Sequence, residues 1–156
     1  VKNQVKSGID CFQLFETYSG IISNEDYYKL ILPLSTKILL EARESGVPTI
    51  FFPKNFNEGL KYINKEMCDY VSVDYDISLD YARNLLDSEV GIQGNMDPKI
   101  FYQEIDEIEN YLKSLIDFGS KNTDWIFNLG HGFRPDIDHI KVKYVVEWIK
   151  NANWKR

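Results

Sequence analysis

The sequence of 156 residues predicts an α/β protein built on a parallel β-sheet, and two patterns support this prediction. Short apolar runs rich in β-branched and aromatic residues recur along the chain, and each is about as long as one strand. Between them lie longer segments in which apolar residues follow the spacing of a helix. Strands that alternate with helices pair in parallel, because each connection crosses back over the sheet in the same right-handed sense.

Five strands are expected, and with the helices between them they give the order βαβαβαβαβα. The runs that predict these strands are Cys11–Phe15, Thr49–Phe52, Tyr70–Val73, Val90–Ile92 and Trp125–Phe127.

The first helical segment runs from Ser23, a capping residue type, to Gly46, and Pro33 is expected to divide it because proline lacks an amide donor. The clearest amphipathic helix is predicted over Glu104–Phe118, and Gly119 is expected to end it. Further helices are predicted over Asn57–Met67, Leu79–Asp87 and Asp138–Asn151.

Two architectures fit this alternation of strands and helices. A five-stranded doubly wound sheet needs about this length of chain, whereas a complete (β/α)₈ barrel takes about 250 residues. Length alone favours the doubly wound sheet. No internal repeat or low-complexity linker divides the chain, so residues 1–156 are expected to form a single domain.

Composition and charge exclude several classes of function. A net charge of −6 and the lack of a basic cluster argue against binding to nucleic acid. The most apolar segment, residues 27–40, is interrupted by two lysines and a proline, so no membrane partner is expected. Cys11 and Cys68 lack the spacing of a zinc site or a disulfide framework, which favours a reducing compartment. No apolar stretch at the start of the sequence has the charged flank and cleavage site of a signal peptide, and we expect Val1 to be a cut rather than a natural terminus.

In both architectures a ligand binds at the carboxyl ends of the strands, where this sequence has polar loops. His131 follows the last strand between two glycines, which can present its imidazole to a ligand. The competing interpretation is a histidine bonded to a neighbouring carbonyl in a tight turn. Lys54 and Arg134 are the basic residues of these loops, and either could meet a substrate carboxylate or a neighbouring Asp.

Other polar residues of these loops are expected to be structural. Asp74 and Asp76 are interpreted as caps rather than as a catalytic pair, and Asn95–Pro98 as a turn. His139 is expected to be a solvated residue at a helix start. No glycine-rich phosphate loop follows any strand, which argues against a nucleotide or flavin site.

Three of these loops, taken together, resemble one family. The segments are QLFETYSG at residues 13–20, QGNMDP at 93–98 and FNLGHGFRP at 127–135. They resemble the QxF(D/E)S-x-AG, QGNLDP and FNLGHGxxP motifs of uroporphyrinogen decarboxylases, in the same order and spacing. The resemblance covers residues 8–149 and implies the five carboxy-terminal βα units, strands four to eight, of an incomplete (β/α)₈ TIM barrel. The first three units, with an arginine-rich loop and a catalytic aspartate, are expected upstream.

The resemblance also implies an activity and site residues. Members of this family remove the four acetate carboxyls of uroporphyrinogen, a tetrapyrrole of haem biosynthesis, without a metal or an organic cofactor. His131 corresponds to the family's active-site histidine, which contacts the substrate and assists proton transfer. Thr17 falls on a serine whose hydroxyl binds a substrate carboxylate. Arg134 lies at a variable position, and we expect it to contact a carboxylate at the mouth of the barrel. The family further implies a homodimer in the cytoplasm, with a plastid as the other possible compartment.

The sequence departs from the family pattern at two strand ends. Ser72–Tyr75 keeps only the Asp and an aromatic of a GLDW-like run, and Asn55 follows Lys54 where a glycine is common. Related barrels that transfer methyl groups to corrinoids hold zinc through His-x-Cys and a later Cys, and this chain has neither. A second hypothesis is that this chain is a non-catalytic fragment, or half of a barrel that needs an amino-terminal partner.

Overall fold

The computed structural model describes residues 1–154 and contains a five-stranded sheet in which every neighbouring pair of strands is parallel. All five predicted strands are confirmed, and the fourth extends four residues further than predicted. The strands are β1 (Phe12–Glu16), β2 (Thr49–Pro53), β3 (Tyr70–Ser72), β4 (Gly91–Met96) and β5 (Trp125–Leu129).

The order of the strands decides between the two predicted architectures. The strands lie side by side in chain order, β1-β2-β3-β4-β5. A doubly wound sheet reverses its strand order at a switch point, whereas a (β/α)₈ barrel adds each new strand on the same side of the last. The prediction of five consecutive barrel units is therefore confirmed, and the doubly wound alternative is wrong.

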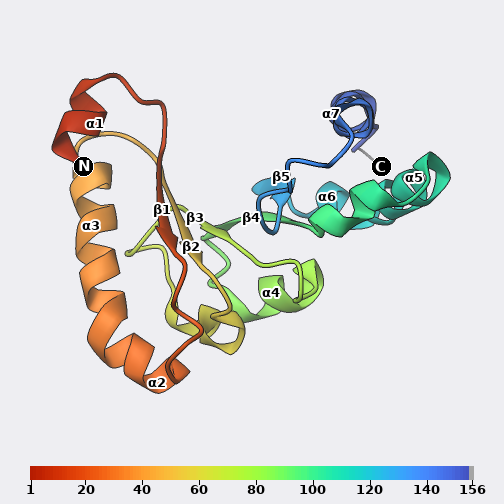
Figure 1. The fold of residues 1–156 in the computed structure, drawn as a ribbon. Coiled ribbons are helices and arrows are strands. Elements are labelled where there is room, and N and C mark those ends of the chain that lie inside the picture. The colour runs from red at the N-terminus through yellow and green to blue at the C-terminus, as the bar shows by residue number, and fades with distance from the viewer. Residues whose placement is uncertain (155–156) are drawn as a thin grey trace.

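The helices lie along the outside of the arc that the strands form (Figure 1). Helix α3 packs beside β1 and β2, helix α4 against β4, and α5 beside α7 at the far end of the arc. None of the described helices has the length and apolar character needed to cross a membrane. The helices are α1 (Lys2–Lys6), α2 (Asn24–Asp26), α3 (Leu32–Glu44), α4 (Leu79–Leu85), α5 (Ile105–Ser114), α6 (Ile116–Lys121) and α7 (His139–Asn151), with a π-turn at Tyr27–Ile31 and 3₁₀ turns at Asn57–Tyr62 and Pro98–Tyr102.

The two faces of the sheet differ in burial at its edge strands, whereas residues at its centre are buried on both faces. Phe51, Val71 and Ile92 form one row across the outer face and are fully buried under the helices. On the inner face, Phe15 is 65% exposed and Ile126 is 38% exposed. Alternate residues of barrel strands point into the barrel interior, so these are side chains that a closed barrel would cover. Within residues 1–154, the inner face is open at β1 and β5, and the outer edges of these two strands are unpaired.

Two helix predictions meet different outcomes. The segment from Ser23 to Gly46 is divided as expected: Ser23 caps α2, a π-turn follows, and Pro33 lies in the first turn of α3, where an amide donor is not needed. The prediction of one helix over Glu104–Phe118 is wrong. A turn at Leu115 separates α5 from α6, and the Leu115 amide donates to the Leu112 carbonyl at 3.1 Å, three residues back rather than four.

Gly119 does not end that segment, since α6 continues to Lys121. A Cβ at Gly119 would lie 2.6 Å from the Trp154 ring and 2.9 Å from Trp125. The glycine therefore allows an aromatic cluster to approach the helix. All three tryptophans belong to this cluster, because Trp154 also lies 6.2 Å from Trp148 between ring centres.

The helix predicted over Asn57–Met67 is also wrong, because only a 3₁₀ turn forms and it ends at Tyr62. Asn64 starts a separate turn, in which its side-chain oxygen accepts the Glu66 amide at 3.1 Å and its carbonyl accepts the Met67 amide. Asparagine side chains that bond nearby amides favour such turns over helix.

Asp69 joins three elements at the amino-terminal end of the sheet. Its carboxylate accepts the amide and hydroxyl of Thr49 in β2, at 3.0 and 3.1 Å, and the Lys65 ammonium at 2.9 Å. Arg43 of α3 adds an ion pair at 3.6 Å. In barrel proteins this end serves stability, whereas ligands bind at the opposite end.

Candidate functional site

The loop that carries His131 is held tightly against two neighbouring loops. The Gly130 amide donates to the Met96 carbonyl at the end of β4. A Cβ at Gly130 would lie 2.4 Å from the Tyr75 amide nitrogen, in the loop after β3. Only a glycine permits this close approach. The position of His131 at the carboxyl end of β5 is thus fixed by backbone packing.

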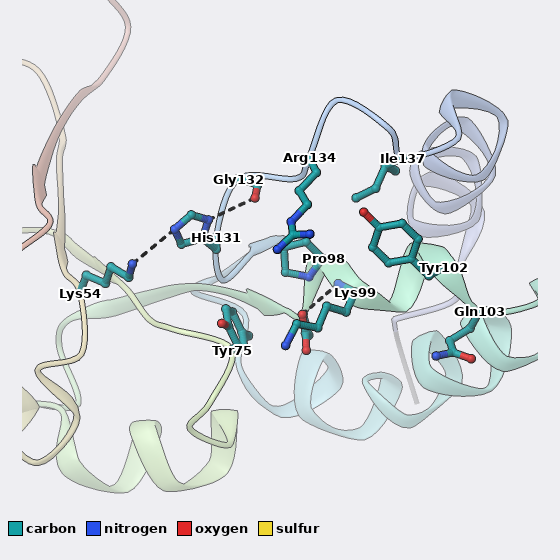
Figure 2. A pocket seen from close by; sticks show the side chains of 11 residues that line it. Lys54, Tyr75, Pro98, Lys99, Tyr102, Gln103, His131, Gly132, Arg134 and Ile137 are labelled. Carbon is teal, nitrogen blue, oxygen red and sulfur yellow. Dashed lines mark hydrogen bonds between the residues drawn. The ribbon is translucent and has the colours of Figure 1, made fainter.

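Two contacts orient the His131 ring (Figure 2). Its Nε2 lies 3.4 Å from the Lys54 ammonium, which can only donate, and its Nδ1 lies 3.1 Å from the Gly132 carbonyl, which can only accept. In a neutral ring, these two partners favour the tautomer that carries its proton on Nδ1. The carbonyl contact proposed in the competing interpretation is therefore present, but the ring is also exposed and faces a pocket.

That pocket, here called the outer pocket, has a volume of about 530 Å³. It lies among the loops that follow β3, β4 and β5, with Lys54 reaching it from the end of β2. The charged and aromatic side chains among its lining residues are Lys54, Lys99, Arg134, Asp97, Tyr75 and Tyr102.

A second hollow, here called the inner hollow, has a volume of about 430 Å³ on the concave face of the sheet. It is bordered by Phe15 and Phe52 from β1 and β2, and by the glycine-flanked loop with His131. His131 lines both cavities, so it lies where they meet. Gln93 lies on the same face, and its side-chain nitrogen is buried without a hydrogen-bond partner among residues 1–154.

Asp74 and Asn95 hold the loops beneath the outer pocket together. The buried Asp74 carboxylate accepts the amide of Asn55, which has a positive φ of 59°. The Asn95 amide donates to the Asp74 carbonyl at 2.7 Å. Burial raises the pKa of Asp74, partly offset by the Asn55 hydrogen bond and raised further by Asp76. Helix α4 begins at a Ser78 cap, so the expectation that Asp74 and Asp76 cap a helix is wrong, and Asp74 instead links its own loop to the loop after β2.

The three predicted site residues lie in different places. His131 and Arg134 share the outer pocket, but Thr17 is exposed just beyond edge strand β1 and lines neither cavity. His139 begins α7 with a 93% exposed side chain, which confirms that it is solvated. Within the described part of the chain, no group of three or more His, Cys, Asp or Glu side chains could hold a metal ion.

Sequence reasoning missed Lys99 and Tyr102 as lining residues. Both belong to the 3₁₀ turn after Pro98, which Asp97 caps by accepting the Lys99 amide at 2.9 Å. Both residues lie close after the QGNMDP segment, and this position could have predicted them as site residues. Residues that follow a strand end reach the ligand edge of a parallel sheet.

The chain-ordered parallel sheet, with cavities at the carboxyl ends of its strands, places this chain in the class of (β/α)₈-barrel proteins. Residues 1–152 match the family described as Uroporphyrinogen decarboxylase (URO-D). The chain belongs to the uroporphyrinogen decarboxylase family, as its three motifs indicated.

Curated relatives named uroporphyrinogen decarboxylase agree with this assignment. The Geobacter sulfurreducens protein is 32% identical over 97% of this chain and 45% of its own length. The Vesicomyosocius okutanii protein is 32% identical over 96% of this chain and 44% of its own length. The Chlorobium phaeovibrioides protein is 34% identical over 97% of this chain and 45% of its own length. The chain thus spans about 45% of the length of the relatives it matches.

Proposed function

We propose that this chain supplies the carboxy-terminal part of a uroporphyrinogen decarboxylase, which converts uroporphyrinogen to coproporphyrinogen. The observation that supports this most strongly is the position of His131, held where the inner hollow meets the outer pocket. The family membership of the chain gives this histidine its chemical context.

The proposed reaction removes carbon dioxide from each of four acetate side chains. Protonation of a pyrrole carbon makes a ring cation, which accepts the electron pair left when the bond to the carboxylate breaks. The exocyclic carbon then takes up a proton and becomes a methyl group, while the ring loses the proton it gained. Such a site needs cationic anchors for carboxylates and a group that positions or transfers a proton.

We assign three residues to these tasks. His131 contacts the substrate and assists proton transfer. Arg134 contacts a substrate carboxylate at the mouth of the barrel. The Thr17 hydroxyl binds another carboxylate, and its exposed position beside β1 is one that further barrel strands would approach. We further propose a homodimer in the cytoplasm, which suits the two free thiols.

The test uses a completed barrel, meaning this chain joined to amino-terminal strands. These strands come from coding sequence upstream of Val1 or from the Geobacter sulfurreducens relative. We expect His131→Asn in the completed barrel to lower turnover by about 10² or more, the range of a lost proton-transfer group. The matched control is His139→Asn, because His139 is solvated and lines neither cavity. Turnover and affinity equal to those of the unsubstituted protein would remove His131 from the site.

The second candidate, a chain that is non-catalytic on its own, is favoured by the open inner face and strand edges. We expect no coproporphyrinogen from residues 1–156 alone under anaerobic conditions, and product from the completed barrel. Product from the isolated chain would contradict this expectation.

A further inference from the structure

The outer pocket gathers positive charge in an acidic protein. Three of its lining side chains are cationic, Lys54, Lys99 and Arg134, and one is anionic, Asp97, in a chain of net charge −6. Figure 2 shows the three cationic side chains extending toward the space beside His131.

Within the described part of the chain, these cations lack carboxylate partners. Among residues 1–154, none of the three forms an ion pair, although basic residues elsewhere, such as Arg83 with Asp124, do so. Asp97 already accepts the Lys99 amide as a helix cap. Like charges brought together without compensation repel one another, so the arrangement favours a bound anion.

The pocket walls also suit an unsaturated ligand. The Tyr75 ring is 40% exposed, and the Lys99 ammonium lies 6.0 Å from its centre. The Tyr102 hydroxyl donates to the Asp136 carboxylate at 3.0 Å, so Tyr102 offers the pocket its ring rather than its hydroxyl. A volume of about 530 Å³ fits part of a large ligand.

We infer that the outer pocket is a carboxylate-binding subsite, in which Lys99 and Arg134 hold side-chain carboxylates of a tetrapyrrole whose ring lies toward the inner hollow. This inference rests on the proposed function and adds Lys99 to the site. His131, which lines both cavities, then lies between the ring and the anchored carboxylates. Lys54 contributes charge while it donates to His131.

The test is a fluorescence titration of the completed barrel with uroporphyrin, the stable oxidised compound with eight carboxylates. We expect Lys99→Gln and Arg134→Gln each to weaken binding by about three- to tenfold, as for partly exposed charge pairs, and the double variant by about tenfold or more. The effect should shrink as salt is added. The matched control is Lys37→Gln, at an exposed position of helix α3, and this variant should bind as the unsubstituted protein does.

The outcomes separate this inference from the proposed function. If uroporphyrin binds equally to the unsubstituted protein and the double variant, the subsite is wrong and the proposed activity stands. If binding depends on both cations but no coproporphyrinogen forms, the subsite stands and the activity is wrong. If the unsubstituted protein does not bind uroporphyrin but forms coproporphyrinogen, the subsite is wrong and the proposed activity stands. Inorganic phosphate at 10 mM and millimolar citrate are tested as competitors of the porphyrin. If phosphate displaces the porphyrin to the same extent as citrate, the pocket is a general phosphate site and the carboxylate assignment is wrong.

Discussion

Replacing Asp69 with Ala should remove a large part of the stability at the amino-terminal end of the sheet. Two hydrogen bonds from Thr49 contribute about 1 kcal/mol each, and the partly exposed Lys65 pair about 0.5–1 kcal/mol after solvent screening. Thr49 is fully buried, so its amide and hydroxyl would lose an acceptor that water cannot replace. We therefore expect a loss of about 3 kcal/mol in the free energy of unfolding.

This effect should depend on pH in a defined direction. Burial alone would raise the pKa of Asp69, but hydrogen bonds from Lys65 and Thr49 outweigh it and lower the pKa below its ordinary value of 3.8. A carboxyl with a lowered folded-state pKa contributes stability above the unfolded value and loses it as pH falls through the folded value. The difference in stability between the unsubstituted protein and the Asp69→Ala variant should therefore be constant from about pH 7 to 5 and shrink below about pH 4.

The assay is urea denaturation of the completed barrel, followed by circular dichroism. Asp69→Asn is the matched control, because it keeps an acceptor for Thr49 and should cost only about 1 kcal/mol. A loss below about 1 kcal/mol for Asp69→Ala at pH 7, or an equal loss at pH 7 and pH 3.5, would refute the reasoning.

Three further predictions concern single positions. Gly130→Ala places a methyl group 2.4 Å from the Tyr75 amide nitrogen, so it should lower the free energy of unfolding by about 1–3 kcal/mol and displace the His131 loop. An unchanged midpoint of urea denaturation would contradict this. Asn55→Ala should cost about 1 kcal/mol at its φ of 59°, whereas Asn55→Gly should be tolerated, and equal losses would contradict the strain argument. Burial raises the pKa of Cys68 to about 12, so iodoacetamide at pH 8 should label the exposed Cys11 first. Mass spectrometry measures the labelling of each cysteine, and equal labelling rates would show that Cys68 is accessible.

The sequence predicted the strands well because each apolar run is bounded by polar turn residues. The architecture did not follow from those runs, since a doubly wound sheet and a barrel share the same alternation of strands and helices. The three family motifs pointed to the barrel, and the chain order of the strands decided it.

The helix errors and the missed site residues have local causes. A turn at Leu115 divides the predicted helix over residues 104–118, and Gly119 serves tryptophan packing rather than a helix end. Neither effect is visible in helical spacing. Lys99 reaches the outer pocket only because a 3₁₀ turn follows Pro98 at once, and sequence periodicity cannot resolve so short a turn.

The aromatic cluster makes the chain's own fluorescence a local probe. All three tryptophans lie at the end of the arc that carries β5 and α7, and none lies near β1–β3. Indole emission therefore senses the open edge of β5, where Trp125 begins the strand. An added strand that docks on that edge would shift this emission, and one that pairs only with β1 would leave it unchanged. Tryptophan emission therefore reports strand pairing at the β5 edge of the sheet and does not report pairing at the β1 edge.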